Sequence, residues 1–213
     1  MKSGFVTLIG RPNSGKSSLV NMLVDKKVAG VSPKPQTTQK QVKGILNIGD
    51  TQIVFVDTPG IYHSNKKSHL DLLNKAKHAL EDVELVLFVV DSTREFGTED
   101  EKALDILSLL KLDVFLVITK IDLIKGGLDK IGEELVEKAE SKLKDRLKET
   151  FLISNKTSEG RDILLKAIIK NMPEHFWYFE NMELTYPPSF RSNNHSNMAD
   201  IRPFQNIQSH RQI

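Results

Sequence analysis

Gly10-Arg11-Pro12-Asn13-Ser14-Gly15-Lys16-Ser17 is the stretch that decides the fold of this chain. It has the pattern G-x-x-x-x-G-K-[ST], follows an apolar run over residues 5–9 and precedes a helix-like run over residues 18–23. Between a strand and a helix this pattern is a phosphate-binding loop, whereas in isolation it would be a glycine-rich turn. The glycines let the backbone curve around a polyphosphate, whose charge then faces the loop N–H groups and the positive end of the helix.

The polar residues of this loop have separate expected roles. Lys16 places a mobile positive charge at the β- and γ-phosphates and is a candidate catalytic residue, and the Ser17 hydroxyl suits Mg²⁺. Asn13 has two interpretations: a ligand for K⁺ beside the phosphates, or a structural residue that holds the loop. The residues of this stretch expected to contact the nucleotide are Gly10, Asn13, Ser14, Gly15, Lys16, Ser17 and Ser18.

The composition narrows the class of protein. The 213 residues suffice for one α/β domain and a remainder, and a net charge of +2 gives no overall field that favours nucleic acid or a membrane. The absence of cysteine excludes disulfides and thiolate metal sites and fits a reducing cytoplasm. The longest apolar run, residues 85–90, is far shorter than a membrane span and predicts a strand buried on both faces.

Strand-like and helix-like segments alternate along the chain. Strands are expected at residues 5–9, 42–48, 52–56, 85–90, 114–118 and 151–153, and helices at 17–25, 70–80, 102–110, 132–148 and 162–169. This alternation predicts an α/β fold, a doubly wound and mostly parallel six-stranded sheet in which the hairpin at 42–56 adds one antiparallel edge strand. Ligands of such sheets bind beyond the C-terminal ends of the strands, where all the motifs fall.

The periodic pattern ends near residue 172. We expect a nucleotide-binding domain over residues 1–172, an aromatic linker over 173–186 and an irregular, unpatterned tail over 187–213. The aromatic residues around Trp177 have two interpretations, a plug that covers the base of the domain or a platform on which RNA bases stack.

Asp57-Thr58-Pro59-Gly60 follows the predicted hairpin. The Asp57 carboxylate can hold Mg²⁺, usually through water, and the Gly60 N–H can bond the γ-phosphate and let the backbone turn when that phosphate leaves. We therefore expect Asp57, Thr58, Pro59 and Gly60 to line the site, with Gly60 counted among the catalytic residues. A plain turn after a strand is the alternative, which the preceding phosphate loop disfavours.

Thr119-Lys120-Ile121-Asp122 is the expected selector of the base. A carboxylate at Asp122 can accept two hydrogen bonds from guanine, at its ring N–H and its amino group, and adenine offers neither. Lys120 should lie flat against the base, and Thr119, where many such sites have Asn, is a shorter residue that can still tie the loop. Ser154, Asn155 and Lys156 should close the other side of the base with backbone N–H groups.

Thr38 is the candidate switch residue in the proline-containing loop over residues 29–40. Its hydroxyl can bind Mg²⁺ when the γ-phosphate orders the loop, and it counts as catalytic, although spacing alone does not exclude Thr37. Ile61 stands where a glutamine could orient the attacking water. Hydrolysis would then rest on positioning and on charge neutralisation by Mg²⁺, Lys16 and a second cation.

Together these residues resemble the translation-factor class of GTPases, and specifically the Era family, a bacterial group that acts in small-subunit ribosome assembly. Gly-Arg-Pro-Asn at 10–13 and Val-Ser-Pro-Lys-Pro-Gln-Thr-Thr at 31–38 carry the specific likeness, which covers about residues 4–185. The resemblance implies a Ras-like GTPase domain that binds GTP, GDP and Mg²⁺, slow hydrolysis, a monomer, recognition of 16S rRNA and the 30S subunit, and a cytoplasmic location with peripheral membrane contact.

The chain departs from the family in three ways. Gln39 stands where Arg is frequent, Thr119 replaces the usual Asn, and Asn155 replaces a usual Ala. The family also carries a C-terminal KH domain, whose RNA-binding loop needs Gly-x-x-Gly, and no glycine follows Gly160. We therefore expect a truncated or frame-disrupted member with weakened RNA binding.

Three functions remain to be compared. The first is a GTP-hydrolysing switch in ribosome assembly, and the second is a GTP-binding interaction module with negligible turnover because the RNA-binding domain is missing. The third, an ATP-using enzyme, conflicts with Asp122.

Overall fold

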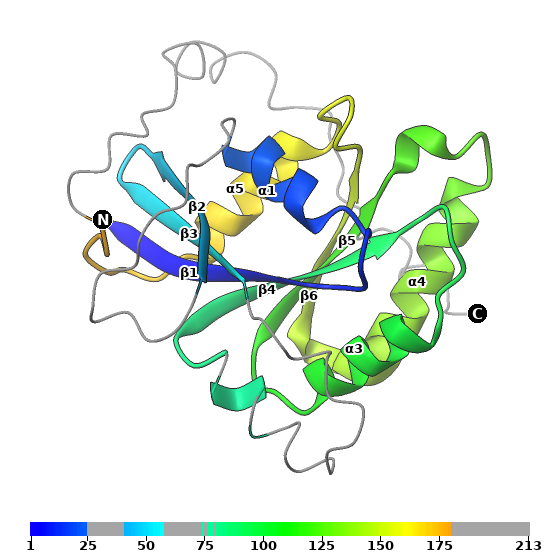
Figure 1. Ribbon diagram of the computed structural model, residues 1–213, viewed down its shortest axis with the longest axis horizontal. Helices are drawn as coiled ribbons and strands as arrows, with labels where there is room; N and C mark the ends of the chain where they lie inside the picture. The colour runs from blue at the N-terminus through cyan, green and yellow to red at the C-terminus, as the bar shows by residue number, and fades with distance from the viewer. Residues whose placement is uncertain (25–40, 58–73, 75, 79, 180–213) are drawn as a thin grey trace, which may run out of the picture.

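The sheet of this protein lies between two layers of helices, as the computed structural model shows (Figure 1). The structure describes residues 1–24, 41–57, 74, 76–78 and 80–179. For Gln41 and Asp57 it describes the backbone alone. The predicted switch loop, the residues 58–73 and the predicted tail lie outside the described residues. Within the described part no helix is both long and apolar enough to cross a membrane.

Six strands form one sheet in the order β2-β3-β1-β4-β5-β6, in which β2 pairs antiparallel with β3 and every other pair is parallel. The predicted fold class and the antiparallel edge strand are thus confirmed. The strands are β1 Lys2–Ile9, β2 Gln41–Ile48, β3 Thr51–Asp57, β4 Val83–Asp91, β5 Asp113–Thr119 and β6 Leu147–Ile153. The α-helices that lie wholly within the described residues are α1 Lys16–Val24, α3 Thr98–Ser108, α4 Leu128–Leu143 and α5 Arg161–Asn171. Two short 3₁₀ turns in the same part of the chain are η1 Ile121–Leu123 and η2 Lys144–Arg146.

The central strands are apolar on both faces because helices cover both. In β4, Leu85, Leu87 and Val89 belong to the core beneath α1 and α5. Val86, Phe88 and Val90 alternate with them and belong to the core on the side of α3 and α4. An uninterrupted apolar run is the pattern that a parallel strand buried on both faces requires.

The C-terminal ends of three neighbouring strands lie level with one another. Asp91 of β4 is paired with Thr119 of β5, and Thr119 is paired with Ile153 of β6. The loops after these strands therefore leave the sheet side by side, next to the loop that follows β1. This register places the predicted motifs around one edge of the sheet.

At the opposite edge, the segment 173–179 covers the N-terminal ends of β1 and β3. Ser3 N–H donates to the Pro173 carbonyl at 3.2 Å, and the buried Gln52 side chain exchanges two hydrogen bonds of 3.0 Å with the backbone of Phe179. The Tyr178 ring packs on Phe5 with 4.4 Å between centroids. These contacts favour the plug interpretation of the aromatic residues, while the domain boundaries stay a prediction.

The prediction of a helix over residues 132–148 is wrong at both ends. α4 runs from Leu128 to Leu143, and β6 already begins at Leu147. Lys144 leaves helical geometry at φ 55° and ψ −127°. The residues that follow have no strong strand pattern, so their pairing with β5 decides their conformation.

Candidate nucleotide-binding site

The loop after β1 has a backbone that requires its glycines. A Cβ added at Gly10 would lie 2.2 Å from the Val89 carbonyl oxygen, so no side chain fits there. Gly15 has φ +98°, a conformation that L side chains rarely adopt. Asn13 also has a positive φ, of 64°, in the left-handed region that asparagine tolerates.

Lys16 is the first residue of α1 and reaches back across the loop. Its Nζ donates to the carbonyl oxygens of Gly10 at 2.6 Å and of Arg11 at 2.7 Å. Its ammonium group therefore lies at the mouth of the loop, near the helix N-terminus, where two sources of positive potential add. Ser17 and Ser18, in the same first turn, are exposed.

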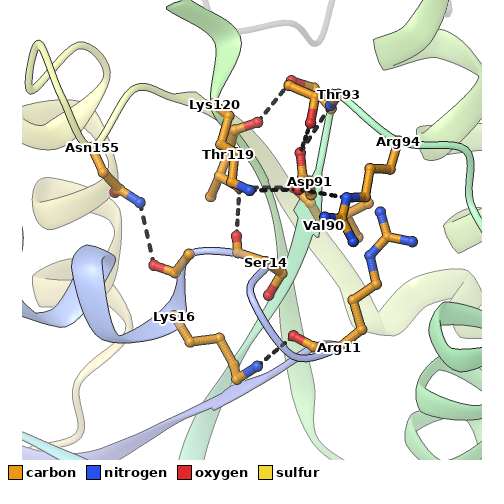
Figure 2. A network of polar contacts seen from close by, with 12 residues as sticks. Arg11, Ser14, Lys16, Val90, Asp91, Thr93, Arg94, Thr119, Lys120 and Asn155 are labelled. Atoms are coloured by element: carbon orange, nitrogen blue, oxygen red, sulfur yellow. Dashed lines mark hydrogen bonds and ion pairs between the residues drawn. The ribbon is translucent and has the colours of Figure 1, made fainter. Parts of the chain in front are cut away.

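Thr119 ties the loop to the sheet. The side chain is fully buried, and its Oγ1 lies 2.7 Å from the Ser14 carbonyl oxygen and 3.1 Å from that of Val90 (Figure 2). The expectation that a threonine at this position can still tie the loop is confirmed.

Asp91, at the end of β4, organises the polar groups beside Thr119 (Figure 2). It is 1% exposed, and its Oδ2 accepts from Lys120 Nζ at 2.6 Å while its Oδ1 accepts from the backbone and hydroxyl of Thr93. Burial raises the pKa of Asp91, but the bonds from Lys120 and Thr93 outweigh it, so the pKa lies below its ordinary 3.8. No role for Asp91 was predicted from the sequence. The signal that could have found it is a carboxylate directly after the continuous apolar run of a strand.

Lys120 itself has φ 62°, which turns the chain sharply after β5 and leads into η1. Asp122 lies in η1 and accepts a hydrogen bond from Ser154 Oγ at 2.7 Å. The carboxylate keeps further lone pairs for a base. The structure thus brings the predicted base selector to the turn after β6 that was predicted to face it.

The turn after β6 also reaches the phosphate loop. Asn155 Nδ2 donates to the Gly15 carbonyl oxygen at 3.2 Å. Ser154 is buried and also accepts from Thr157 N–H, while Lys156 is exposed in the turn. The predicted residues 154–156 are therefore adjacent to both the loop and Asp122, and their contact with a nucleotide stays a prediction.

Arg11 connects the loop to α3. Its Nη1 lies 3.2 Å from Oδ2 of Asp100, whose side chain is fully buried, and donates to the Glu95 carbonyl oxygen at 3.2 Å. Burial raises the pKa of Asp100, and the Gly97 N–H and the Arg11 charge offset only part of that effect. This contact holds the loop against the helix layer and was not predicted from the sequence.

Several predicted site residues lie outside the described residues: Thr38, Thr58, Pro59 and Gly60. Asp57 is placed as the last residue of β3, with nothing stated for its side chain. Hydroxyl and carboxylate oxygens are the ligands that Mg²⁺ prefers. The donor types at Ser17 and Asp57 therefore fit this ion.

The comparisons with known proteins agree with this architecture. The family described as 50S ribosome-binding GTPase matches residues 5–120. GTPase Era of Lactobacillus delbrueckii subsp. bulgaricus is 42% identical over 194 residues, which cover 89% of this chain and 61% of that protein. GTPase Era of Geobacter metallireducens is 38% identical over 191 residues, with 88% and 61% covered.

Two solved structures are similar along most of the chain. Era in complex with MgGDPNP and nucleotides 1506–1542 of 16S ribosomal RNA has a TM-score of 0.66 and 36% identity, covering 84% of this chain and 60% of that one. A single-residue variant of Aquifex aeolicus Era bound to GDP.AlF4⁻ has a TM-score of 0.66 and 35% identity, covering 89% and 63%.

This chain therefore belongs to the family of 50S ribosome-binding GTPases and has their Ras-like fold. Within that family it is a homologue of the GTPase Era, as the residues of the phosphate and switch loops indicated. The chain spans 61% of the length of these two relatives.

Proposed function

We propose that this chain binds GTP and GDP with Mg²⁺ and hydrolyses GTP slowly, as a switch of the Era type in assembly of the small ribosomal subunit and maturation of 16S rRNA. The observation that carries the proposal is the link between the phosphate loop and the base selector. Asn155 contacts Gly15 of the loop, and the adjacent Ser154 contacts Asp122. One short turn thus connects the group that would read the base with the group that would hold its phosphates.

The residues of the loop supply binding and charge. The N–H groups at the start of α1 and the Lys16 ammonium meet the phosphates, and Lys16 exchanges its carbonyl partners for phosphate oxygens as the anion enters. In the transition state the same groups stabilise the charge that develops on the phosphate oxygens. Ser17, Asp57 and Thr38 would hold Mg²⁺, which would supply positive charge that neutralises the phosphate oxygens.

The expected intrinsic rate is on the order of 10⁻³ per second or less, because Ile61 cannot orient water as a glutamine does. K⁺ at Asn13, whose left-handed backbone lies within the loop, would add a second cation. Equal turnover in K⁺ and Na⁺ would refute that role. The alternative function, a GTP-binding interaction module with negligible turnover, is favoured by the same isoleucine.

The wider role comes from the relatives. A cytoplasmic monomer that contacts 16S rRNA, the 30S subunit and the inner membrane surface is proposed by homology, since one similar structure is a complex with a 16S rRNA fragment.

Titration and turnover test the proposal. GTP and GDP should bind at least tenfold more tightly than ATP and ADP, and Lys16→Ala should abolish tight binding. Turnover is then measured with and without small ribosomal subunits. Acceleration by the particles supports the switch, absence of turnover in both supports the binding module, and equal affinity for adenine and guanine nucleotides would contradict both.

A further inference from the structure

Two side chains from neighbouring strand ends hold consecutive carbonyl groups of the phosphate loop. Thr119, the last residue of β5, donates from Oγ1 to the Ser14 carbonyl oxygen at 2.7 Å. Asn155, in the turn after β6, donates from Nδ2 to the Gly15 carbonyl oxygen at 3.2 Å (Figure 2). The two contacts come from different elements but act on adjacent peptide groups.

Because of the geometry of the peptide bond, these two contacts also set the direction of two N–H groups in the phosphate loop. In a trans peptide the C=O and the N–H point in opposite directions. The Ser14 carbonyl shares its peptide group with the Gly15 N–H, and the Gly15 carbonyl shares its own with the Lys16 N–H. Fixing both carbonyls toward β5 and β6 therefore turns the two N–H groups to the opposite side of the loop, as an anion site requires.

Thr119 cannot supply both contacts. A hydroxyl carries one proton, and the Thr119 hydroxyl already faces the Ser14 carbonyl oxygen. The Gly15 carbonyl has two lone pairs, one of which accepts the first helical N–H, from Leu19 at 2.8 Å. The other is met by the Asn155 amide, which supplies the second donor.

The immediate surroundings of Gly15 show that both residues reach it. A Cβ placed on Gly15 would lie 3.0 Å from Asn155 Nδ2 and 3.5 Å from Thr119 Oγ1. Asn155 Oδ1, by contrast, is buried with no hydrogen-bond partner in the described part of the chain. A buried unpaired oxygen costs free energy, so packing stability alone does not account for an amide at this position.

We propose that Asn155 is a positioning residue for nucleotide binding: it shares with Thr119 the work of orienting the N–H groups of the phosphate loop. The proposal deepens the proposed function and rests on it. It assigns the Asn155 side chain to the phosphate end of the ligand, whereas sequence reasoning expected only the backbone of this turn to act, at the base.

The test compares Asn155→Ala, Thr119→Asn and the double variant by fluorescence titration with GDP and with inosine diphosphate, which lacks the 2-amino group. One lost hydrogen bond should weaken binding of GDP about 3- to 10-fold. The inosine nucleotide should lose the same factor, because a loop-positioning residue does not read the 2-amino group. Asn155→Ser replaces the alanine variant if that variant does not fold.

The double variant moves the amide group from position 155 to position 119. If Asn155 had only a structural role, this move would not restore the affinity for GDP. Asparagine at 119 is longer than threonine and carries two N–H donors, so it can reach the Gly15 carbonyl once position 155 is emptied. Thr119→Asn alone should give no gain, whereas Thr119→Asn combined with Asn155→Ala should restore GDP affinity to within about twofold of the unmodified chain.

The matched control is Asn171→Ala. Asn171 also donates from Nδ2 to a backbone carbonyl, that of Ala167 at 2.9 Å, but at the C-terminal end of α5. Its loss should leave GDP affinity unchanged.

Three results would overturn the inference: GDP affinity of Asn155→Ala within twofold of the unmodified chain, no rescue in the double variant, or a changed ratio of GDP to inosine nucleotide affinity. Titration of the unmodified chain separates the two proposals. Failure to bind GDP there defeats the proposed function, whereas binding that Asn155→Ala leaves intact defeats only this inference.

Discussion

Asp122 shows how one carboxylate is held for recognition. It lies in the 3₁₀ turn η1 and accepts from Ser154 Oγ at 2.7 Å, which fixes its orientation but uses only part of its accepting capacity. The remaining lone pairs suit the two adjacent N–H groups that guanine presents. A short contact from a buried serine thus orients the residue that would choose the base.

Asp122→Asn should change the base that is preferred. The amide can donate to the 2-carbonyl oxygen of xanthine but cannot accept two bonds from guanine, so the affinity ratio of GTP to xanthosine triphosphate should fall about 100-fold or more. Competition titration measures the ratio. Asp129→Asn is the same chemical change at an exposed position on α4, and it should leave the ratio unchanged. Retained GTP preference in Asp122→Asn would count against the assignment.

Asp91 contributes stability that depends on pH. Because its pKa is lowered in the folded protein, its contribution is fully present above pH 3.8 and is lost as the pH falls through the lower folded pKa. Asp91→Asn should reduce the free energy of unfolding at pH 7 by about 2 kcal/mol. The difference in unfolding free energy between the two proteins should narrow below pH 3.8, because Asp91 becomes protonated in the unmodified protein whereas asparagine does not titrate.

Urea unfolding between pH 7 and the acid range measures that gap. Asp105→Asn is the matched control: its ion pair with Lys142 has the same 2.6 Å distance as that of Asp91 with Lys120, but the Asp105 side chain is 52% exposed against 1% for Asp91. Exposed pairs contribute little, so this variant should change the unfolding free energy only slightly. A gap for Asp91→Asn that stays constant with pH would contradict the argument.

At the scale of elements, α4 illustrates the competition between local pattern and sheet pairing. Its surface is charged, and its buried stripe is Gly132, Leu135, Ala139 and Leu143. After Leu143 the chain turns, and the Arg146 guanidinium donates to carbonyl groups at the C-terminal end of α3, among them those of Leu107 and Ser108. This contact anchors the chain where the helix ends and β6 begins.

Leu135→Ala should destabilise the protein by about 2 to 4 kcal/mol, because it opens a cavity between α4 and the sheet at a side chain only 5% exposed. Lys130→Ala, on the exposed face of the same helix, should cost less than about 0.5 kcal/mol. Chemical denaturation of the three proteins measures the difference. Similar costs for both variants would show that α4 is not held by its apolar stripe.

At the scale of the whole molecule, the two ends of the strands have different surroundings. The C-terminal edge of the sheet carries the loops of the candidate site, and at its other edge the segment 173–179 covers the ends of β1 and β3. Phe179 is 3% exposed there, and the side-chain amide of Gln52 both donates to its carbonyl oxygen and accepts from its N–H. Phe179 therefore belongs to the packed core, although it follows the predicted domain boundary.

Phe179→Ala should consequently lower the unfolding free energy by about 3 kcal/mol, whereas Phe176→Ala should change it by less than about 0.5 kcal/mol. Phe176 is the same residue type in the same segment but is 82% exposed. Thermal unfolding without nucleotide distinguishes them. If the two variants unfold at the same temperature, the segment does not contribute to the core.

The sequence by itself determined the sheet, its antiparallel edge strand and the position of each described motif at a strand end, because apolar runs, glycine loops and turns are local signals. Only the tertiary structure decided where α4 ends, that Asp91 pairs with Lys120, and that Asn155 reaches Gly15. Each of these depends on residues that are distant in the chain. Strand register brings them together, and no local pattern specifies which side chains then meet.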